Sequence, residues 1–305
     1  GGCELGPRPI DLHIRAFQAL GAQVRSWNGR LSFYGPRLHG RRLALPIPSV
    51  GATENAMLAA CGAEGTTVIA NAAREPEIVD LQTFLQKMGA HVQGAGSSTV
   101  VVEGGAPLHG CVHTVVADRI VAATYLAAAA GTGGDIRLEG VDYRHLSAVA
   151  TMLRQAGCRL TCGETSIRLQ APRRLQSAGP IRTAPYPGFP TDAQAVLMAS
   201  LLRSEGATVF VENIFDSRYR HVPEMVRMGA DIRLEGRVAV VCGVDRLHGA
   251  AVRAKELRGG ASLVLAGLQA EGETAVTGVE HIQRGYEDLT GELAQLGADI
   301  RQEER

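Results

Sequence analysis

The 305-residue sequence has no charge imbalance, few aromatic residues and no long hydrophobic run. Its 31 basic and 31 acidic residues give a formal net charge of zero, which argues against binding of nucleic acid by bulk charge. The longest apolar stretch, from Ile120 to Ala130, is shorter than the roughly 20 residues that a membrane-spanning helix needs. The sequence therefore predicts a protein that neither binds nucleic acid nor inserts into a membrane.

Motifs of several familiar chemistries are also missing. The six cysteines form no CxxC pair or zinc pattern, and the nine histidines form no HExxH pair, so we assign no metal site. No secretory signal opens the sequence, and the cysteines fit the free thiols of a cytoplasmic protein. There is no Walker phosphate loop, and residues 94–99 fail the GxGxxG pattern because Thr99 occupies its last position.

Glycine and small aliphatic residues are abundant instead. The 37 glycines, with 45% hydrophobic but only 4% aromatic residues, indicate many tight turns around an aliphatic core. A helix-period segment that ends in Gly-Ala, or once Gly-Cys, and leads into a β-branched strand recurs at intervals of 68, 68, 72 and 68 residues. The glycines of these pairs are Gly21, Gly89, Gly157, Gly229 and Gly297. This spacing predicts a repeated structural unit.

A second series of helices, rich in alanine and leucine on all sides, lies between these pairs. We predict them over residues 52–65, 119–131, 192–206 and 261–272, each closed by a glycine in a left-handed C-cap. Each leads into a strand-like run, at 66–71, 135–138, 207–212 and 274–277. Because helices that are apolar all round belong in the interior, we expect an α/β fold with helices buried inside a ring of sheets.

The repeat also predicts the domain organisation. Two units precede residues 112–118 and three follow, so we place a first domain over residues 1–115 and a second over residues 116–305. The sequence opens inside a unit, and at least one further period upstream would give six units in two sets of three. We therefore expect roughly a sixth to a quarter of a longer protein to precede Gly1.

Four arginines are candidates for binding an anionic ligand. Arg8, Arg218, Arg258 and Arg284 mostly stand in or beside turns marked by glycine or proline. A guanidinium offers paired donors to a carboxylate or phosphate, so several converging arginines would form an anion-binding cleft. The alternative is that each arginine lies in a solvated surface loop.

Three other positions each have a structural and a functional interpretation. Asp192 begins an otherwise apolar helix, where it either stabilises the helix N-terminus or serves as a general base. Cys3, near Arg8, is either a reactive thiol or an ordinary free cysteine. Residues 49–51 begin another buried helix, and they either cap it or offer backbone N–H groups to a ligand.

Taken together, the motifs resemble those of the UDP-N-acetylglucosamine 1-carboxyvinyltransferases, which are enolpyruvyl transferases of the EPSP synthase family. The resemblance extends over essentially the whole chain, through residues 1–13, 49–53, 71–80, 182–194, 221–229, 261–267 and 284–287. None of the characteristic motifs of the related shikimate-pathway enzyme is present. The resemblance implies two inside-out α/β barrel domains of repeated strand-helix-strand-strand-helix units, which close over the substrates.

The resemblance also implies roles for individual residues. Cys3 resembles a mobile-loop cysteine that donates a proton and is alkylated by fosfomycin, and Asp192 resembles the carboxylate that accepts the proton of the sugar 3-hydroxyl. The positions that resemble the phosphoenolpyruvate site and the closing cleft are Arg218, Glu256, Arg258 and Arg284, of which Arg284 is also counted as catalytic. The positions that resemble the UDP-N-acetylglucosamine site are Arg8, Pro9, Ile10, Asp11, Leu12, Ser49, Val50, Gly51, Asp192 and Ile214.

The activity implied by the resemblance is transfer of the enolpyruvyl group of phosphoenolpyruvate to UDP-N-acetylglucosamine, with release of phosphate. This reaction is the first committed step of peptidoglycan synthesis, which serves cell shape and cell division, and it needs no metal or organic cofactor. The sequence indicates no protein partner, and its neutral charge leaves monomer and dimer open.

The sequence departs from the family pattern at three points. Glu256 stands where the family usually has aspartate, Ile47 replaces a lysine, and the family's Lys-Asn pair and a further arginine belong to a part upstream of Gly1. We therefore expect activity from a complete parent rather than from this chain alone. The alternatives are a paralogue or fragment that binds a UDP-sugar without turnover, and a transferase with another hydroxyl acceptor.

Overall fold

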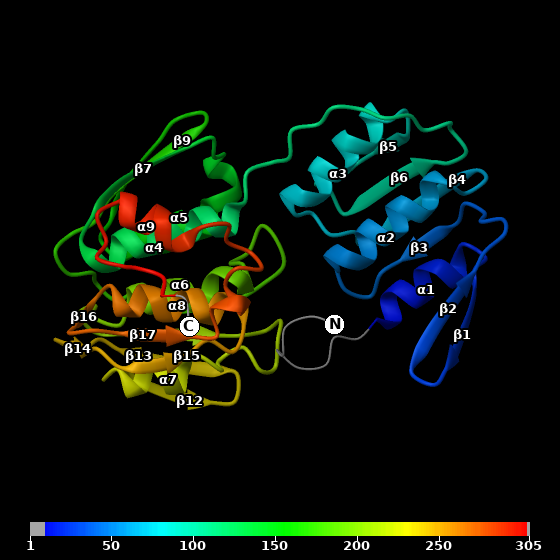
Figure 1. Cartoon of the computed structure of the whole chain (residues 1–305). Coiled ribbons are helices and arrows are strands. Elements are labelled where there is room, and N and C mark those ends of the chain that lie inside the picture. Colours follow the sequence, from blue (N-terminus) through cyan, green and yellow to red (C-terminus); the bar gives the residue numbers. More distant parts are fainter. Residues whose placement is uncertain (1–9, 304–305) are drawn as a thin grey trace. The chain divides into compact units, whose positions relative to one another are not determined.

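The computed structural model describes residues 10–303, which divide into two compact units. The first unit comprises residues 10–116 and 185–187, and the second comprises residues 117–184 and 188–303 (Figure 1). No helix within these ranges is long and apolar enough to cross a membrane.

The first unit is built from helices, a four-stranded sheet and a hairpin. The sheet has the order β3-β4-β6-β5, in which β3 and β4 are parallel and the other neighbours are antiparallel. The strands β1 and β2 form an antiparallel hairpin, and α2 packs against both α1 and α3. The elements are α1 (Asp11–Ala19), β1 (Gln23–Trp27), β2 (Arg30–Tyr34), β3 (Arg42–Ala44), α2 (Val50–Cys61), β4 (Thr66–Ala70), α3 (Pro76–Lys87), β5 (His91–Gln93) and β6 (Thr99–Glu103).

The second unit repeats this plan. Its sheet β10-β11-β13-β12 has the same order and the same strand directions as the sheet of the first unit, and β7-β9-β8 forms a shorter version of it. Two parallel pairs, β14-β16 and β15-β17, complete the strands described for this unit. The helices are α4 (Arg119–Thr132), α5 (Ser147–Gln155), α6 (Thr191–Ser200), α7 (Val222–Arg227), α8 (Leu257–Gly267) and α9 (Leu289–Gln295), with short 3-10 turns at η1 (Tyr143–Leu146) and η2 (Val279–His281). The strands are β7 (Asp135–Glu139), β8 (Arg159–Cys162), β9 (Ser166–Gln170), β10 (Ile181–Arg182), β11 (Ala207–Val211), β12 (Asp231–Glu235), β13 (Val238–Cys242), β14 (Leu247–His248), β15 (Ala251–Arg253), β16 (Ala270–Glu271) and β17 (Ala275–Thr277).

The Gly-Ala pairs mark equivalent helix ends, as their spacing predicted. All five glycines have φ between 93° and 102°, a left-handed conformation that only glycine adopts without strain. After the last pair, residues 298–303 form no strand, so the strand predicted there is wrong for the described part of the chain. The C-caps predicted for the small-residue helices are also wrong. The helix α4 continues past Gly131, and its left-handed cap is Gly133. The helices α2, α6 and α8 end at Cys61, Ser200 and Gly267, several residues before the left-handed Gly65, Gly206 and Gly272.

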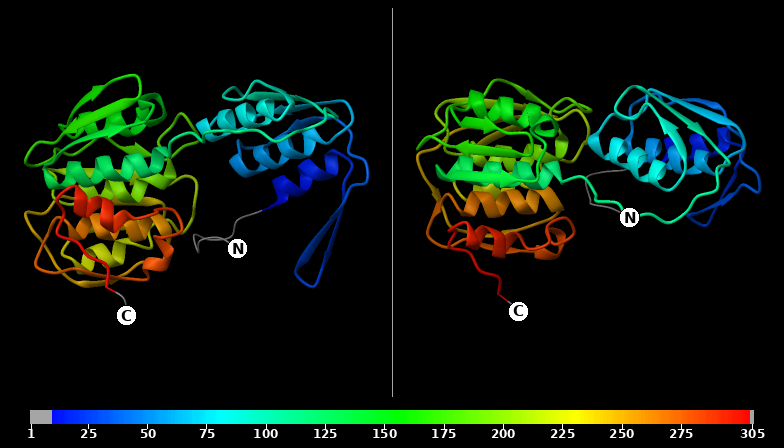
Figure 2. Two further views of the ribbon diagram at one scale, coloured as in Figure 1. Left: turned by 45° about the horizontal axis from the view of Figure 1, so that its top comes forward. Right: turned by 90° about the horizontal axis from the view of Figure 1, so that it is seen from above.

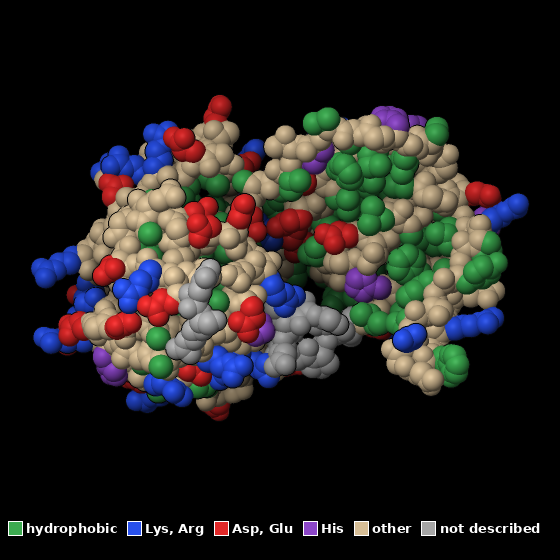
Figure 3. Space-filling model, in the orientation of Figure 1, with side chains coloured by type: hydrophobic (Ala, Val, Ile, Leu, Met, Phe, Trp, Pro, Cys, Tyr) green, Lys and Arg blue, Asp and Glu red, His purple; other side chains and the backbone are tan. Residues whose placement is uncertain are grey.

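The small-residue helices lie in the interior of the second unit. The helices α4, α6 and α8 pack side by side, with strands and the amphipathic helices around them (Figure 2). Eight residues of α6, from Ala193 to Ser200, are buried, which confirms the expected arrangement of helices inside sheets. In the first unit α2 is less enclosed, since half of the Leu58 surface is exposed, and the visible face of this unit carries many hydrophobic side chains (Figure 3).

Candidate active site

Acidic residues stand at the N-termini of all three interior helices of the second unit. Asp118 caps α4 by accepting hydrogen bonds from the amides of Ile120 (2.7 Å) and Val121 (3.0 Å). Glu256 caps α8 through the amides of the first turn. Asp192 instead lies at the second residue of α6, whose N-cap residue, Pro190, offers no side-chain bond. The carboxylate of Asp192 is therefore directed elsewhere.

Its partner is Arg218, the largest fully buried side chain among the described residues. Arg218 Nη2 donates to Asp192 Oδ1 (2.8 Å) and to the Thr191 carbonyl (3.1 Å), and Nη1 lies 3.8 Å from Glu256 Oε2. Arg218 is only 1% exposed, whereas the Asp192 side chain is 44% exposed. The buried Arg218 guanidinium thus lies between two carboxylates, of which Asp192 is exposed to solvent and Glu256 is buried.

Arg258 lies in the first turn of α8 and belongs to the same cluster. Its guanidinium lies 5.2 Å from the centre of the Tyr286 ring, and the Tyr286 hydroxyl is hydrogen-bonded to Thr124 of α4 (2.7 Å). Burial lowers the pKa of Arg258, but Tyr286 and the carboxylates of Asp192 and Asp118 outweigh burial and raise it. Within the described residues, Nε and Nη1 of Arg258 are buried without a hydrogen-bond partner. Arg258 therefore holds donors that an anion can use.

His221 packs beside this cluster, at the start of α7. Its Cβ would lie only 3.1 Å from a Cβ at Gly259 of α8, so the two segments are in close contact. Burial, and secondarily the positive charge of Arg218, lowers the pKa of His221 to about 3. The imidazole is therefore neutral at physiological pH and adds no charge to the cluster.

Predicted site residues of the first unit lie at two neighbouring helix N-termini. Ser49 caps α2 by accepting a hydrogen bond from the Ala52 amide (3.4 Å), and Val50 and Gly51 form the first turn of the helix. His13 of α1 is hydrogen-bonded to Asn55 of α2 (2.7 Å), which holds the two helix starts together. Of the predicted residues at the start of α1, Ile10 and Asp11 are exposed and Leu12 is buried in the core.

The remaining predicted residues fall in different settings. Arg284 lies exposed in the turn two residues before Tyr286, and Ile214 lies half-exposed in the loop that leads to Arg218. Cys3, Arg8 and Pro9 lie outside the described residues. The structure thus brings Asp192, Arg218, Glu256 and Arg258 into one cluster in the second unit, and places residues 10–12 beside residues 49–51 in the first.

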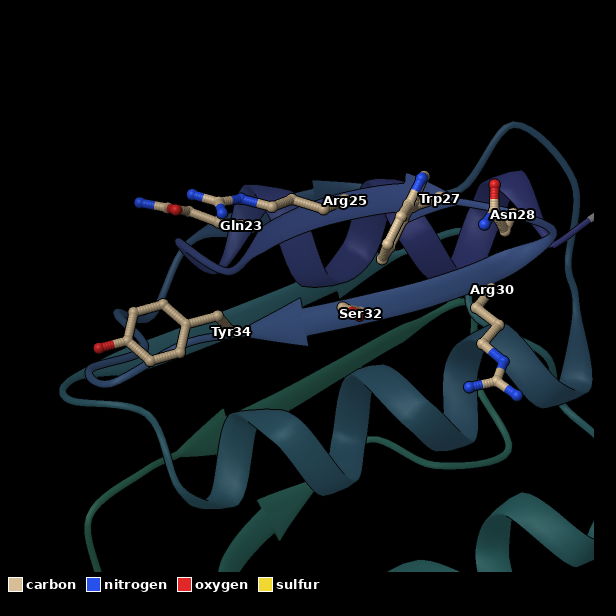
Figure 4. Close-up of a pocket in the computed structure, with 7 residues that line it drawn as sticks. All are labelled: Gln23, Arg25, Trp27, Asn28, Arg30, Ser32 and Tyr34. Carbon is tan, nitrogen blue, oxygen red and sulfur yellow. The ribbon is translucent and has the colours of Figure 1, made fainter.

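A separate hollow of about 900 Å³ lies on the hairpin of the first unit. Its lining alternates along β1 and β2 and includes Trp27, which is 80% exposed, with Arg25, Arg30 and Tyr34 (Figure 4). None of the predicted site residues lines it. Within residues 10–303 no group of three His, Cys, Asp or Glu side chains is placed to hold a metal ion.

Sequence reasoning missed several members of the cluster. Asp118 and Thr124 belong to none of the named motifs, and His221 and Tyr286 lie in motifs but were assigned no role. Only the folded structure brings these residues near Arg218 and Arg258. The repeat offered one signal, because Asp118, Asp192 and Glu256 all stand at starts of small-residue helices. Helix starts that are equivalent in a repeat lie at the same end of the packed helices.

Comparison with known proteins places the chain among enolpyruvyl transferases. The EPSP synthase (3-phosphoshikimate 1-carboxyvinyltransferase) family matches residues 1–293. UDP-N-acetylglucosamine 1-carboxyvinyltransferase 2 of Caldanaerobacter subterraneus subsp. tengcongensis is 50% identical over 300 residues, which are 98% of this chain and 72% of that protein. UDP-N-acetylglucosamine 1-carboxyvinyltransferase of Zymomonas mobilis is 51% identical over 302 residues, which are 98% of this chain and 71% of that protein.

Solved structures agree on the fold. The enolpyruvyl transferase NikO from Streptomyces tendae superposes with a TM-score of 0.88 at 26% identity, over 96% of this chain and 72% of that one. EPSP synthase from Acinetobacter baumannii superposes with a TM-score of 0.73 at 22% identity, over 98% of this chain and 73% of that one. The inside-out α/β architecture expected from the repeat is thereby confirmed. The chain belongs to the EPSP synthase family, and within it to the UDP-N-acetylglucosamine 1-carboxyvinyltransferases.

Proposed function

We propose that the chain transfers the enolpyruvyl group of phosphoenolpyruvate to the 3-hydroxyl of UDP-N-acetylglucosamine and releases phosphate. The hydroxyl oxygen bonds to C2 of phosphoenolpyruvate while C3 gains a proton, which gives a tetrahedral intermediate. Loss of phosphate from C2 and of a proton from C3 then restores the double bond. The reaction needs a base for the hydroxyl proton, an acid for C3 and cations for the carboxylate and phosphate.

The observation that carries this proposal is the buried arginine pair. Arg218 and Arg258 are 1% and 8% exposed, and nitrogen atoms of both guanidiniums lack partners within the described residues. Leaving buried charged donors unsatisfied is costly, so such donors are suited to a ligand that supplies several anionic oxygens. Phosphoenolpyruvate carries a carboxylate and a phosphate, and Arg284 from the neighbouring exposed turn would complete the set.

Asp192 is the residue we assign as base. Its carboxylate is half-exposed, it is held by Arg218, and it is not used in capping its own helix. Cys3 is the proposed acid and the proposed point of attachment for fosfomycin. For the sugar nucleotide we assign residues 8–12 and residues 49–51, together with Ile214.

The cellular setting follows from the reaction. We assign the chain to the cytoplasm, where both substrates are made, and to peptidoglycan synthesis, which sustains cell shape and division. The proposed chemistry uses proton transfer and charge stabilisation only, so no metal or organic cofactor enters it.

Phosphate release from phosphoenolpyruvate tests the proposal directly. The assay compares this chain with a chimera in which the upstream residues of the Caldanaerobacter relative precede it, each with and without UDP-N-acetylglucosamine. Release that depends on the sugar nucleotide supports the function. Binding of UDP-N-acetylglucosamine without release from either protein indicates a non-catalytic member, and release with a different hydroxyl acceptor indicates another transferase.

Two substitutions test the assigned roles. Asp192→Asn keeps the size of the side chain but removes the base, so turnover should fall by about 10²- to 10⁴-fold while the sugar nucleotide still binds. Equal loss of binding and turnover would contradict the assignment as base. Cys3→Ser should abolish covalent labelling by fosfomycin, and labelling that persists would place the reactive thiol elsewhere.

A further inference from the structure

Glu212 is a buried carboxylate that the reaction scheme above does not use. It directly follows β11 and is 1% exposed. Its Oε1 accepts hydrogen bonds from the amides of Ile214 (2.8 Å) and Phe215 (3.1 Å) and from the hydroxyl of Thr183 (3.0 Å). Its Oε2 accepts from the hydroxyl of Thr191 (3.0 Å). Four donors thus converge on one side chain.

These donors belong to three separate segments that border the arginine cluster. Thr191 is the first residue of α6, and its carbonyl accepts a hydrogen bond from Arg218. Ile214 and Phe215 begin the loop that ends at Arg218, whose guanidinium lies 5.8 Å from the centre of the Phe215 ring. Thr183 follows β10 and also accepts from the Asn213 amide (2.8 Å). Glu212 therefore joins both chain segments that hold the Asp192–Arg218 pair.

Comparison of the repeats shows that this arrangement is peculiar to one of them. The residues that follow the equivalent strands β4, β7 and β17 are Asn71, Gly140 and Gly278, with φ of 55°, 74° and 75°. Each of these three closes its turn with a left-handed backbone. Glu212 is not left-handed and bonds the turn through its side chain instead. A residue needed only to end the strand has no reason to differ from the other three.

We propose that Glu212 is a positioning residue, which sets the Asp192–Arg218 pair and the Ile214 backbone in their mutual geometry for enolpyruvyl transfer. This inference rests on the proposed function. Glu212 holds Thr191 on one side and the loop 213–218 on the other, so that the carboxylate of Asp192 and the guanidinium of Arg218 meet at 2.8 Å. Because Glu212 is only 1% exposed, we assign it a role through these hydrogen bonds and no contact with the substrates.

Two substitutions of Glu212 show whether its hydrogen bonds or its negative charge is needed for activity. Glu212→Ala leaves the Ile214 and Phe215 amides without an acceptor and frees α6 from the loop. Because small displacements of catalytic groups lower rates strongly, kcat/KM should fall about 100-fold per folded molecule. Glu212→Gln retains one acceptor oxygen for the amides, and the Thr191 hydroxyl can accept from the new NH₂ group, so this variant should recover most of the loss.

Thr208→Val is the matched control. Thr208 is also fully buried on β11, and its hydroxyl accepts a hydrogen bond from the Ala178 amide (3.0 Å) away from the cluster. Loss of the Thr208 hydroxyl should lower the melting temperature as Glu212→Ala does, because each of the two variants leaves a buried backbone amide without an acceptor. We expect Thr208→Val to keep the wild-type kcat and the wild-type KM for UDP-N-acetylglucosamine, whereas Glu212→Ala changes both.

Amide hydrogen exchange tests the positioning role without relying on turnover. In Glu212→Ala the amides of Ile214 and Phe215 should exchange at least about tenfold faster than in the wild type, while in Thr208→Val only the Ala178 amide should accelerate. If the wild-type chain and its chimera release no phosphate, the proposed function fails, but the exchange experiment still decides whether Glu212 holds the loop.

Three outcomes would overturn the inference. The first is unchanged exchange at Ile214 and Phe215 in Glu212→Ala, since the carboxylate then does not hold the loop. The second is full activity per folded molecule in an active Glu212→Ala protein. The third is an equal kinetic loss in Thr208→Val, because the effect would then follow from general destabilisation of β11.

Discussion

Removing the cation of Arg218 should destabilise the second unit through the carboxylate that it leaves behind. Arg218→Met preserves the length and most of the apolar packing of the side chain but takes away its charge. Glu256, which is almost fully buried and 3.8 Å from Arg218, then loses the ion pair with this guanidinium. Asp192 loses its partner as well, but its half-exposed carboxylate is solvated by water.

The size of the effect follows from these two environments. Breaking a buried ion pair costs about 3–5 kcal/mol, and the lower end applies because Glu256 still accepts two backbone hydrogen bonds at the start of α8. The exposed side of the pair adds at most about 1 kcal/mol. We therefore expect Arg218→Met to lower the free energy of unfolding by about 3 kcal/mol, which is a fall of roughly 6–12 °C in the melting temperature for a unit of this size.

A double substitution identifies the cause. In Arg218→Met with Glu256→Gln the buried carboxylate that lost its partner is also removed, so the double variant should be more stable than Arg218→Met alone by at least about 1 kcal/mol. Calorimetry and denaturant titration of the wild type, both single variants and the double variant measure this coupling. Strictly additive losses would refute the reasoning, because they would show that Arg218 does not offset the charge of Glu256.

Three further predictions concern other buried positions of the chain. The native pKa of His221, about 3, lies below its ordinary value of 6.5, so the unfolded state binds more protons and stability falls as pH drops through this window. His221→Phe should therefore remove roughly 3 kcal/mol of the stability difference between pH 7 and pH 4, as measured by denaturant titration. Gly104→Ala would place a Cβ 2.1 Å from the Ala63 carbonyl oxygen and should cost about 1–3 kcal/mol, whereas Gly110→Ala, with nothing within 4 Å, should leave the melting temperature unchanged. Burial raises the pKa of Cys158 to about 11, so mass spectrometry after brief alkylation at pH 8 should find this thiol modified only in the unfolded protein, and modification in the native protein would contradict its burial.

The repeat explains how much of the fold could be predicted. A left-handed glycine is needed where each amphipathic helix turns into its strand, so Gly21, Gly89, Gly157 and Gly229 fixed the ends of four helices. The error at Gly131 also concerns a glycine that ends a helix. Gly133 and Gly134 follow Gly131 closely, and the sequence does not indicate which of the three adopts the left-handed conformation.

The candidate site could be predicted less completely, because its members meet only through tertiary contacts. Asp192 and Arg218 were recognisable as a helix-start carboxylate and a turn arginine, but nothing in the sequence indicated that they form a pair. Tyr286 and Thr124 are separated by more than half of the chain, and nothing in the sequence indicated that they form a hydrogen bond. Nothing in the sequence around Glu212 marks it as a site residue. It stands out only in the structure, because the residues at the equivalent positions of the other repeats have a left-handed backbone and Glu212 does not.

The start of α6 shows how a repeated fold provides for chemistry at the expense of local stability. Asp118 and Glu256 each cap their own helix, and a cap of this kind contributes about 1 kcal/mol. In α6 the residue before the helix is Pro190, which offers no side-chain cap, and the carboxylate of the first turn, Asp192, accepts a hydrogen bond from Arg218 instead. A capping carboxylate is occupied by backbone amides, whereas Asp192 keeps an oxygen that a substrate hydroxyl can approach. The helix without a side-chain cap is therefore the one whose carboxylate we propose as the base.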